Sequence, residues 1–374
     1  MKVIIAGDFC PVNRAEKLLS DGVSIMSAGL QEYWNSADFR IANLECPVTD
    51  HQKKITKSGP CLKASANIFP ALNQFQFSAL SLANNHIMDF GKTGFRDTLK
   101  MLESSGIEYF GVEVEAKPHA GTILEKDRLK LAVLSYSISE FCLADDFDGN
   151  GARPIDLIKI INDLKHYRAQ ADHMVILLHM GLYMNSFPSP RQREICHFLV
   201  QQGAGAVLCQ HSHVCGAYEQ LGDAFISYGQ GSFLFDLNKT GSHWNEGYLV
   251  ELTLSSQKIS AEIRGTRQFD TKPEIDLMSA EKEAELKQRL DRFNEILKDA
   301  TQLKAAFRKE VERNRRAYYG MMIAPSGRLF NAVKRRINLG SLIPLSMKTV
   351  LLNLYRNEEH SEMIQEILKS DIHE

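Results

Sequence analysis

Residues 78–91 read Ser-Ala-Leu-Ser-Leu-Ala-Asn-Asn-His-Ile-Met-Asp-Phe-Gly. The run Ser78–Ala83 is typical of a buried strand, and it ends at the polar residues Asn84-Asn85-His86. Apolar residues at helical spacing follow, and Gly106 lies where a C-terminal capping glycine belongs. The stretch therefore predicts a strand, a polar turn and a helix in succession.

This alternation of strands and helices recurs up to about residue 235. Other apolar runs that predict strands are Val3–Ala6, Phe39–Ala42, Leu131–Tyr136, Met174–Leu178, Ala206–Cys209 and Ala224–Tyr228. Helical patterns lie between them, and Ser189-Pro190-Arg191-Gln192 has the form of a capping box with proline at the first helical position. Residues 248–264 instead alternate like an antiparallel hairpin. The pattern predicts an α/β architecture.

The character of the sequence changes near residue 272. Residues 278–316 predict one or two long polar helices, and residues 347–355 and 361–368 predict further helices. We therefore expect a main domain at 1–272 and a helical extension at 273–374.

Composition limits the class of protein. The 374 residues are 44% hydrophobic and carry a formal net charge of −2, so the chain can bury a sizeable core and is not as a whole a polyanion binder. Seven cysteines without a C-x-x-C pair indicate a reducing compartment. No secretory signal pattern, spanning apolar run or nucleic-acid motif occurs. We expect a cytoplasmic location.

Groups that can bind a metal follow nearly every predicted strand in the first 215 residues. They are Asp8, Glu45, Asn85, His86, His179, His211 and His213. Ligands of open α/β sheets lie beyond the carboxyl ends of the strands, so we expect these side chains to converge on one crevice. Carboxylates, an amide and imidazoles together suit Mn²⁺, Fe or Zn²⁺ better than Mg²⁺ or Ca²⁺.

Six segments resemble, in order, the motifs of the CapA family of capsule and poly-γ-glutamate synthesis proteins. They are Gly7-Asp8, Asn43-Leu44-Glu45, Leu82–Gly91, His179-Met180-Gly181, Gln210–Val214 and Ile226–Asp236. That family belongs to the calcineurin-like metallophosphoesterases. The resemblance covers roughly residues 1–270 and implies a four-layer α/β/β/α sandwich with a dinuclear metal site.

The resemblance also implies roles for the ligands. Glu45 would bridge two divalent ions of Mn, Fe or Zn. The other ligands would divide as Asp8 and His213 on one ion, and Asn85, His179 and His211 on the other. This arrangement would let a metal-activated water attack a phosphoester.

His86 would remain free to protonate the leaving oxygen, with Asp89 one turn away to fix its tautomer and raise its basicity. Asp89 has a second interpretation, because it could cap the helix that starts near Thr93.

The sequence departs from the family at several positions. The first motif is Asp8-Phe9-Cys10, without the histidine of the superfamily's D-x-H. CapA relatives commonly share this departure, and it implies that the first metal site would be weakly held. Cys10 is either a thiolate ligand or an inert buried thiol. The other departures are Met180, Tyr183, Cys209 and Ser232, which flank the site and bear on substrate choice more than on metal binding.

The C-terminal extension is locally basic. Residues 308–336 hold nine basic and two acidic side chains, and residues 337–356 are apolar and hold no acid. Such a segment (308–356) can lie on an anionic membrane surface or hold an anionic polymer or lipid-linked phosphate. It can equally be a solvated helical subdomain that packs on the main domain or on a second subunit. The sequence leaves these alternatives open.

Together these features predict a metal-dependent phosphoester hydrolase that acts in capsule or other surface-polymer biosynthesis. Two alternatives belong to other classes. One is a non-hydrolytic scaffold of a polymer synthase complex. The other is a metal-dependent hydrolase or transferase of amide bonds in an anionic polymer such as poly-γ-glutamate.

Overall fold

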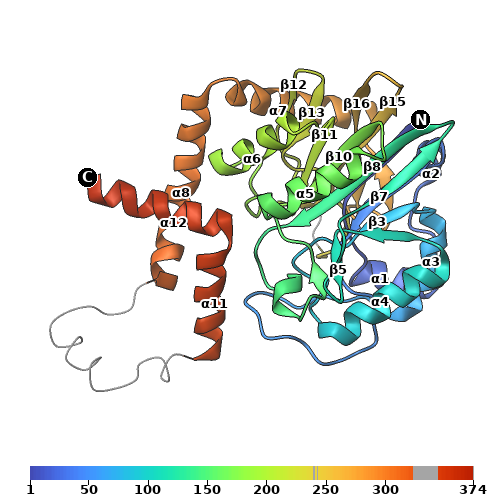
Figure 1. Cartoon of the computed structure of the whole chain (residues 1–374), viewed down its shortest axis with the longest axis horizontal. Coiled ribbons are helices and arrows are strands. Elements are labelled where there is room, and N and C mark those ends of the chain that lie inside the picture. The colour runs from blue at the N-terminus through green and yellow to red at the C-terminus, as the bar shows by residue number, and fades with distance from the viewer. Residues whose placement is uncertain (239–240, 242, 323–343, 374) are drawn as a thin grey trace.

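The computed structural model describes residues 1–238, 241, 243–322 and 344–373. Its first sheet has the strand order β17-β16-β15-β1-β2-β3-β4, and β14 pairs with the end of β1 (Figure 1). The strands are β1 Lys2–Cys10, β2 Phe39–Leu44, β3 Ala79–Ser81, β4 Glu108–Phe110, β14 Ser232–Phe235, β15 Glu246–Leu254, β16 Ile259–Gln268 and β17 Ile275–Leu277. The strands from β1 to β4 run parallel, whereas β15, β16 and β17 form an antiparallel flank.

The second sheet has the order β12-β13-β11-β10-β8-β7. Its strands are β7 Gly121–Lys126, β8 Leu129–Ser137, β10 His173–His179, β11 Ala206–Gln210, β12 Tyr218–Leu221 and β13 Ala224–Ser227. The four inner strands are parallel, and β7 and β12 are antiparallel edges. A small sheet joins β5 Val112–Val114, β6 Lys117–His119 and β9 Gly151–Ala152.

Each central strand buries one face against the other sheet and the opposite face against the outer helices. Val3 and Ile5 pack against Val175 and Leu177 of the facing sheet. The intervening Ile4 packs with the helices α1 Arg14–Ser20, α2 Ala28–Asn35, α3 Phe69–Leu72 and α4 Gly91–Ser105. Side chains of the second sheet pack outward on α5 Leu157–Arg168 and α6 Pro190–Gln201. Because successive strand residues point to opposite faces, the core forms three layers, and the expected α/β/β/α sandwich is confirmed (Figure 1).

The predicted strands are all present, with ends that differ by a few residues. Gly106 caps α4 with φ 68°, as expected. Ser189 accepts from the amide of Gln192, but the Gln192 side chain donates to the Met180 carbonyl instead of completing a capping box. The strands β4, β5, β6, β7, β9, β12, β14 and β17 were not predicted. They are short or lie at sheet edges, where hydrophobic alternation is weak.

The helices described after the sheets are α7 Ala280–Leu297, α8 Ala300–Met322, α11 Leu345–Arg356 and α12 Glu358–His373. The extension is not wholly helical, because β17 adds to the first sheet beyond the boundary expected at residue 272. Leu286 and Leu290 of α7 enter the core between the sheets. A separate cluster joins α8, α11 and α12 to Leu182, three residues beyond His179. The sandwich and the extension thus meet beside the predicted site.

Much of the basic stretch at 308–336 lies outside the described residues, so its expected contact with a membrane or a polymer stays a prediction. In the described part of the following apolar stretch, α11 exposes Leu345, Leu352 and Tyr355. No helix among the described residues is long and apolar enough to cross a membrane.

Candidate metal centre

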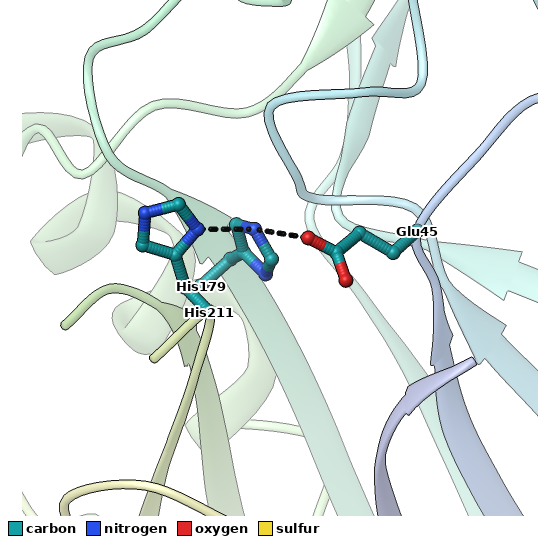
Figure 2. A group of neighbouring side chains, drawn as sticks. All are labelled: Glu45, His179 and His211. Atoms are coloured by element: carbon teal, nitrogen blue, oxygen red, sulfur yellow. Dashed lines mark hydrogen bonds and ion pairs between the residues drawn. The ribbon is translucent and has the colours of Figure 1, made fainter. Parts of the chain in front are cut away.

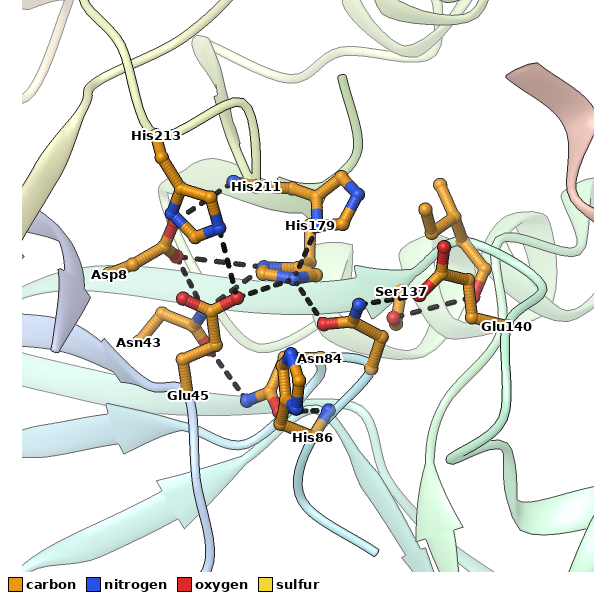
Figure 3. Close-up of polar contacts among 12 residues, drawn as sticks. Asp8, Asn43, Glu45, Asn84, His86, Ser137, Glu140, His179, His211 and His213 are labelled. Carbon is orange, nitrogen blue, oxygen red and sulfur yellow. Dashed lines mark hydrogen bonds and ion pairs between the residues drawn. The ribbon is translucent and has the colours of Figure 1, made fainter. Parts of the chain in front are cut away.

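The expected ligands gather where the carboxyl ends of both sheets meet (Figure 3). Asp8 lies near the end of β1, Glu45 directly follows β2, Asn85 and His86 follow β3, His179 ends β10, and His211 and His213 follow β11. The pairing of β1 with β2 places Asp8 beside Asn43, and the pairing of β10 with β11 places His179 beside Gln210. The parallel register therefore brings together residues that are far apart in the sequence.

Glu45 is the centre of this group. Its side chain is fully buried, and neither carboxylate oxygen has a hydrogen-bond partner among the described residues. Its Oε1 lies 3.4 Å from His179 Nε2 and 3.7 Å from His213 Nε2. Figure 2 shows Glu45, His179 and His211 in one line. A buried carboxylate without hydrogen bonds is costly unless a cation pairs with it, so this donor set fits a divalent metal ion.

Asp8 is held in place by its neighbours. It accepts hydrogen bonds from the Asn43 amide at 2.8 Å and from the His211 backbone at 3.0 Å. Its oxygens also lie 3.6 Å from His179 Nδ1 and 3.4 Å from His213 Nδ1. Burial alone would raise the pKa of Asp8, but hydrogen bonds from these two histidines hold it well below its usual range. The carboxylate is therefore ionised and ready to act as a ligand.

The surroundings shift the pKa values of the three histidines in different directions. Burial would lower the pKa of His179, but Asp8 and Glu45 raise it to about 10. The same two carboxylates raise the pKa of His213 against the effect of burial. Burial and the neighbouring His179 lower the pKa of His211 to about 3. A protonated His179 thus balances the acidic groups, and an ion that binds here has to displace its proton.

The H-x-H segment has an unusual backbone. His211 has φ 87° and His213 has φ 58°, both in the left-handed region. Such conformations cost on the order of 1–3 kcal/mol each for a residue other than glycine and cluster at functional sites. The bond from the His211 amide to Asp8 helps to hold this segment. The strain turns two imidazoles towards one acidic centre.

The ligand atoms form two groups that share one residue. The atoms of Glu45, His179 and His211 lie within 4.8 Å of one another, and so do those of Asp8, Glu45 and His213. Asn85 Oδ1 adjoins the first group, 3.1 Å from His179 Nε2. The predicted division of ligands between two ions follows the same grouping. The number and identity of the ions stay predictions.

His86 and Asp89 form a separate pair beside this centre. His86 Nδ1 lies 2.6 Å from Asp89 Oδ2, and Lys57 Nζ lies 2.6 Å from Asp89 Oδ1 and 3.2 Å from His86 Nδ1. Asp89 also accepts from the Leu62 amide at 2.7 Å. The alternative that Asp89 caps α4 is wrong, because Phe90 is the N-cap and makes no side-chain cap bond. Both carboxylate oxygens of Asp89 instead contact His86, Lys57 and the Leu62 amide.

Sequence reasoning missed three buried groups that support the site. Lys57 lies in the long loop that follows β2, Glu140 lies three residues beyond β8, and Asn357 joins α11 to α12. Glu140 accepts from Asn85 Nδ2 at 2.5 Å and from Asn357 Nδ2 at 3.1 Å. The position of Glu140 shortly after a predicted strand was an available signal. Lys57 and Asn357 had no such signal.

The departures from the family motifs have different surroundings. Burial, with Cys46 beside it, raises the pKa of the Cys10 thiol well above its usual range, which favours the inert thiol. Ser232 Oγ lies 3.2 Å from His213 Nδ1. Tyr183 is 58% exposed, and its ring lies 6.0 Å from that of His213. Ser232 and Tyr183 therefore contact a predicted ligand directly.

Solved structures with a similar arrangement include a phosphatase from Mycoplasma pneumoniae, with a TM-score of 0.49 and 12% identity. That match covers 72% of this chain and 95% of the other. The calcineurin-like phosphoesterase YfkN from Bacillus subtilis has a TM-score of 0.41 and 12% identity, over 70% and 90% of the two chains. At these TM-scores, the assignment of the fold rests on the two facing sheets and their outer helices.

Two curated relatives are more similar in sequence. The capsule biosynthesis protein CapA of Bacillus anthracis is 26% identical over 58% of this chain, and the match spans about half, 54%, of that relative. The PGA biosynthesis protein CapA of Bacillus subtilis is 25% identical over 73% of this chain and 71% of its own length. The family model "Bacterial capsule synthesis protein PGA_cap" matches residues 2–237. Since this match spans more than half of the chain and includes every predicted metal ligand, the protein belongs to the PGA_cap family of bacterial capsule synthesis proteins.

Proposed function

We propose that this protein is a metal-dependent phosphoester hydrolase that acts in capsule or other surface-polymer biosynthesis. The observation that carries the proposal is Glu45, a fully buried carboxylate that lies between His179 and His213 and receives no hydrogen bond from the residues that the structure describes. Family membership and the names of the relatives support the biosynthetic setting.

The ligand roles follow the two groups that share Glu45. Asp8, Glu45 and His213 would hold one ion, and Glu45, Asn85, His179 and His211 would hold the other. Bound divalent ions would neutralise the charge of phosphoryl oxygens and activate water. The protein itself would orient Asp8 through the Asn43 side-chain amide, which donates to it at 2.8 Å.

His86 would serve as the general acid. Asp89 accepts from its Nδ1 side, so Nε2 is the atom left to hold a proton for a leaving oxygen. Lys57 fixes Asp89 by an ion pair and also donates to the backbone carbonyl of Asn85. The loop that carries Lys57 therefore links the acid to a predicted metal ligand.

A basic cavity nearby supports an anionic substrate. A cavity of about 580 Å³ lies between residues 51–56, the start of α4, residues 141–147 and α11. Its basic lining residues are Lys53, Lys54, Lys92 and Arg356, against the single acidic residue Asp146. Its wall is joined to the segment that carries the proposed acid, because the Ile55 amide donates to the backbone carbonyl of Asp89, three residues after His86, at 3.0 Å. This volume is in the range of small-ligand sites.

The experiment is elemental analysis of the purified protein together with turnover of an aryl phosphodiester and an aryl phosphomonoester in Mn²⁺. We expect one or two Mn, Fe or Zn ions per chain and Mn²⁺-dependent turnover. His86→Ala should lower turnover by about 10²–10⁴-fold with the metal content unchanged. No metal and no turnover would support the scaffold alternative, and cleavage of γ-glutamyl peptides in place of phosphoesters would support amide chemistry.

A further inference from the structure

A chain of buried side chains connects the C-terminal helices to Asn85. Asn357 Nδ2 donates to Glu140 Oε1 at 3.1 Å, and Asn85 Nδ2 donates to Glu140 Oε2 at 2.5 Å. Asn85 Oδ1 then lies 3.1 Å from His179 Nε2. None of the three side chains belongs to a residue that is more than 9% exposed. The Asn357–Glu140–Asn85 chain thus runs from the extension into the metal centre.

Glu140 determines which way the Asn85 amide faces. The two ends of an asparagine amide have nearly the same shape, but one end only donates hydrogen bonds and the other only accepts them. Both oxygens of Glu140 receive NH₂ groups, so the donor end of Asn85 must face Glu140. The oxygen of Asn85 is thereby directed towards His179, where only an oxygen can bind a cation.

Asn357 is itself fixed from two sides. Its Oδ1 accepts from the backbone amides of Glu359 at 2.9 Å and His360 at 3.2 Å, which starts α12. Its donor end is therefore the one left for Glu140. Two neighbouring contacts anchor the same junction, from Glu358 to Ser139 at 2.8 Å and from Arg356 to Asp146 at 2.9 Å.

We propose that Glu140 is a positioning residue for Asn85 and that Asn357 makes the α11–α12 junction a functional part of the metal centre. The C-terminal extension then sets the affinity of the sandwich for its ion. The inference rests on the metal-dependent function proposed above. Removal of a group that orients a metal ligand typically weakens metal binding about 10–100-fold.

The test measures Mn²⁺ affinity by calorimetry on the full-length, chelator-treated chain. Glu140→Ala removes the acceptor, and Asn357→Asp keeps the cap of α12 but places a second carboxylate against Glu140. Both should weaken Mn²⁺ binding about 10–100-fold. Ser139→Ala is the matched control, because it removes a hydrogen bond to the same α11–α12 junction. It leaves the side chains of Asn357, Glu140 and Asn85 unchanged. It should retain the wild-type affinity.

Exchanging the carboxylate of Glu140 and the amide of Asn357 distinguishes a loss of positioning from a loss of folding. In the double variant Glu140→Gln, Asn357→Asp, the glutamine oxygen can accept from Asn85 while its NH₂ group donates to the new aspartate. We expect the double variant to bind Mn²⁺ at least about 5-fold more tightly than Asn357→Asp alone, as a restored orienting group should. The metal-free unfolding temperature of each variant identifies any that has lost its fold.

Wild-type affinity in Glu140→Ala, or a double variant no better than Asn357→Asp, would overturn the inference while leaving the proposed function intact. A wild-type protein that binds none of Mn²⁺, Fe²⁺ and Zn²⁺ would overturn the proposed function and the inference with it. The two failures are therefore distinguishable in the same set of titrations.

Discussion

Two acidic side chains of the sandwich, Glu45 and Glu219, lie in opposite kinds of surroundings. Glu219, in β12, accepts from Arg193 at 2.9 Å, from His197 at 2.7 Å and from Tyr228 at 2.5 Å. Glu45 is more deeply buried, yet no described residue donates a hydrogen bond to it. A carboxylate saturated by donors is held by the fold alone. Glu45 has only the longer ion-pair contacts with His179 and His213, so its oxygens remain open to a metal ion.

Glu140 and Asp89 stand between these extremes. Each is buried and hydrogen-bonded, as Glu219 is. Unlike the partners of Glu219, however, their partners belong to the predicted site: Asn85 for Glu140 and His86 for Asp89. These carboxylates do not bind the substrate or the ion in our interpretation. They fix the groups that would do so. The way a buried acid is paired therefore separates ligands, positioning residues and structural ion pairs.

The largest expected effect comes from Glu45→Gln, which removes the shared ligand. Mn²⁺ at 100 times its dissociation constant should stabilise the wild-type chain by about 2.7 kcal/mol. The variant should lose more than about 100-fold in affinity, because even groups that only orient a ligand are worth about 10–100-fold. Thermal unfolding with and without Mn²⁺ measures this shift.

Glu219→Gln is the matched control in that assay, since it makes the same chemical change at a saturated carboxylate. It should keep the full Mn²⁺-dependent shift. Equal shifts in wild type and Glu45→Gln would remove Glu45 from the metal centre.

Local patterns were sufficient to predict the central strands and the residues at their ends. Asp8, Glu45, His179 and His211 were anticipated because parallel strands place their carboxyl ends at one edge. The same reasoning could have reached Glu140, which follows β8 by three residues. The sequence alone could not show that these acids differ in pairing, because pairing depends on tertiary contacts.

Asn357 shows this limit most clearly. It is separated from Glu140 by 217 positions, and its surroundings in the sequence indicate only a helix boundary. Lys57 likewise comes from a loop with no periodic pattern, yet its ammonium group lies against Asp89. The continuation of the first sheet past residue 272 was equally hidden, since β17 has three residues and gains its place by pairing with β16.

The next largest effect is expected for Asp89→Asn. Its carboxylate fixes His86 and pairs with Lys57, so the variant should lose at least about 10-fold of the 10²–10⁴-fold contribution that a general acid typically makes. Metal content should not change, in contrast to Glu45→Gln. Steady-state turnover and elemental analysis of the same sample check both statements. A loss of metal together with turnover would assign Asp89 to the ligands instead.

A smaller effect is expected from the double variant Lys53→Ala, Lys54→Ala in the basic cavity. Neither lysine makes an ion pair with any residue that the structure describes, so both charges are available to an anionic ligand. Exposed charge contacts contribute about 0.2–1 kcal/mol each, so the loss of two predicts a rise in KM of about 2–30-fold at about unchanged kcat. Lys272→Ala, at an exposed lysine paired with Glu274, is the control. An unchanged KM would place the substrate elsewhere.

The smallest effect returns to Glu219 and concerns stability alone. Burial would raise the pKa of Glu219, but hydrogen bonds from Arg193, Tyr228 and His197 lower it below its usual value. Its contribution is thus present above the unfolded pKa of about 4.3 and is lost as the pH falls through the lower folded value. Glu219→Gln should cost about 1 kcal/mol at pH 7, measured by urea unfolding without metal, and the difference from wild type should shrink below about pH 4. A difference that stays constant with pH would mean that the shape of the side chain, and not its charge, is what Arg193 and His197 require.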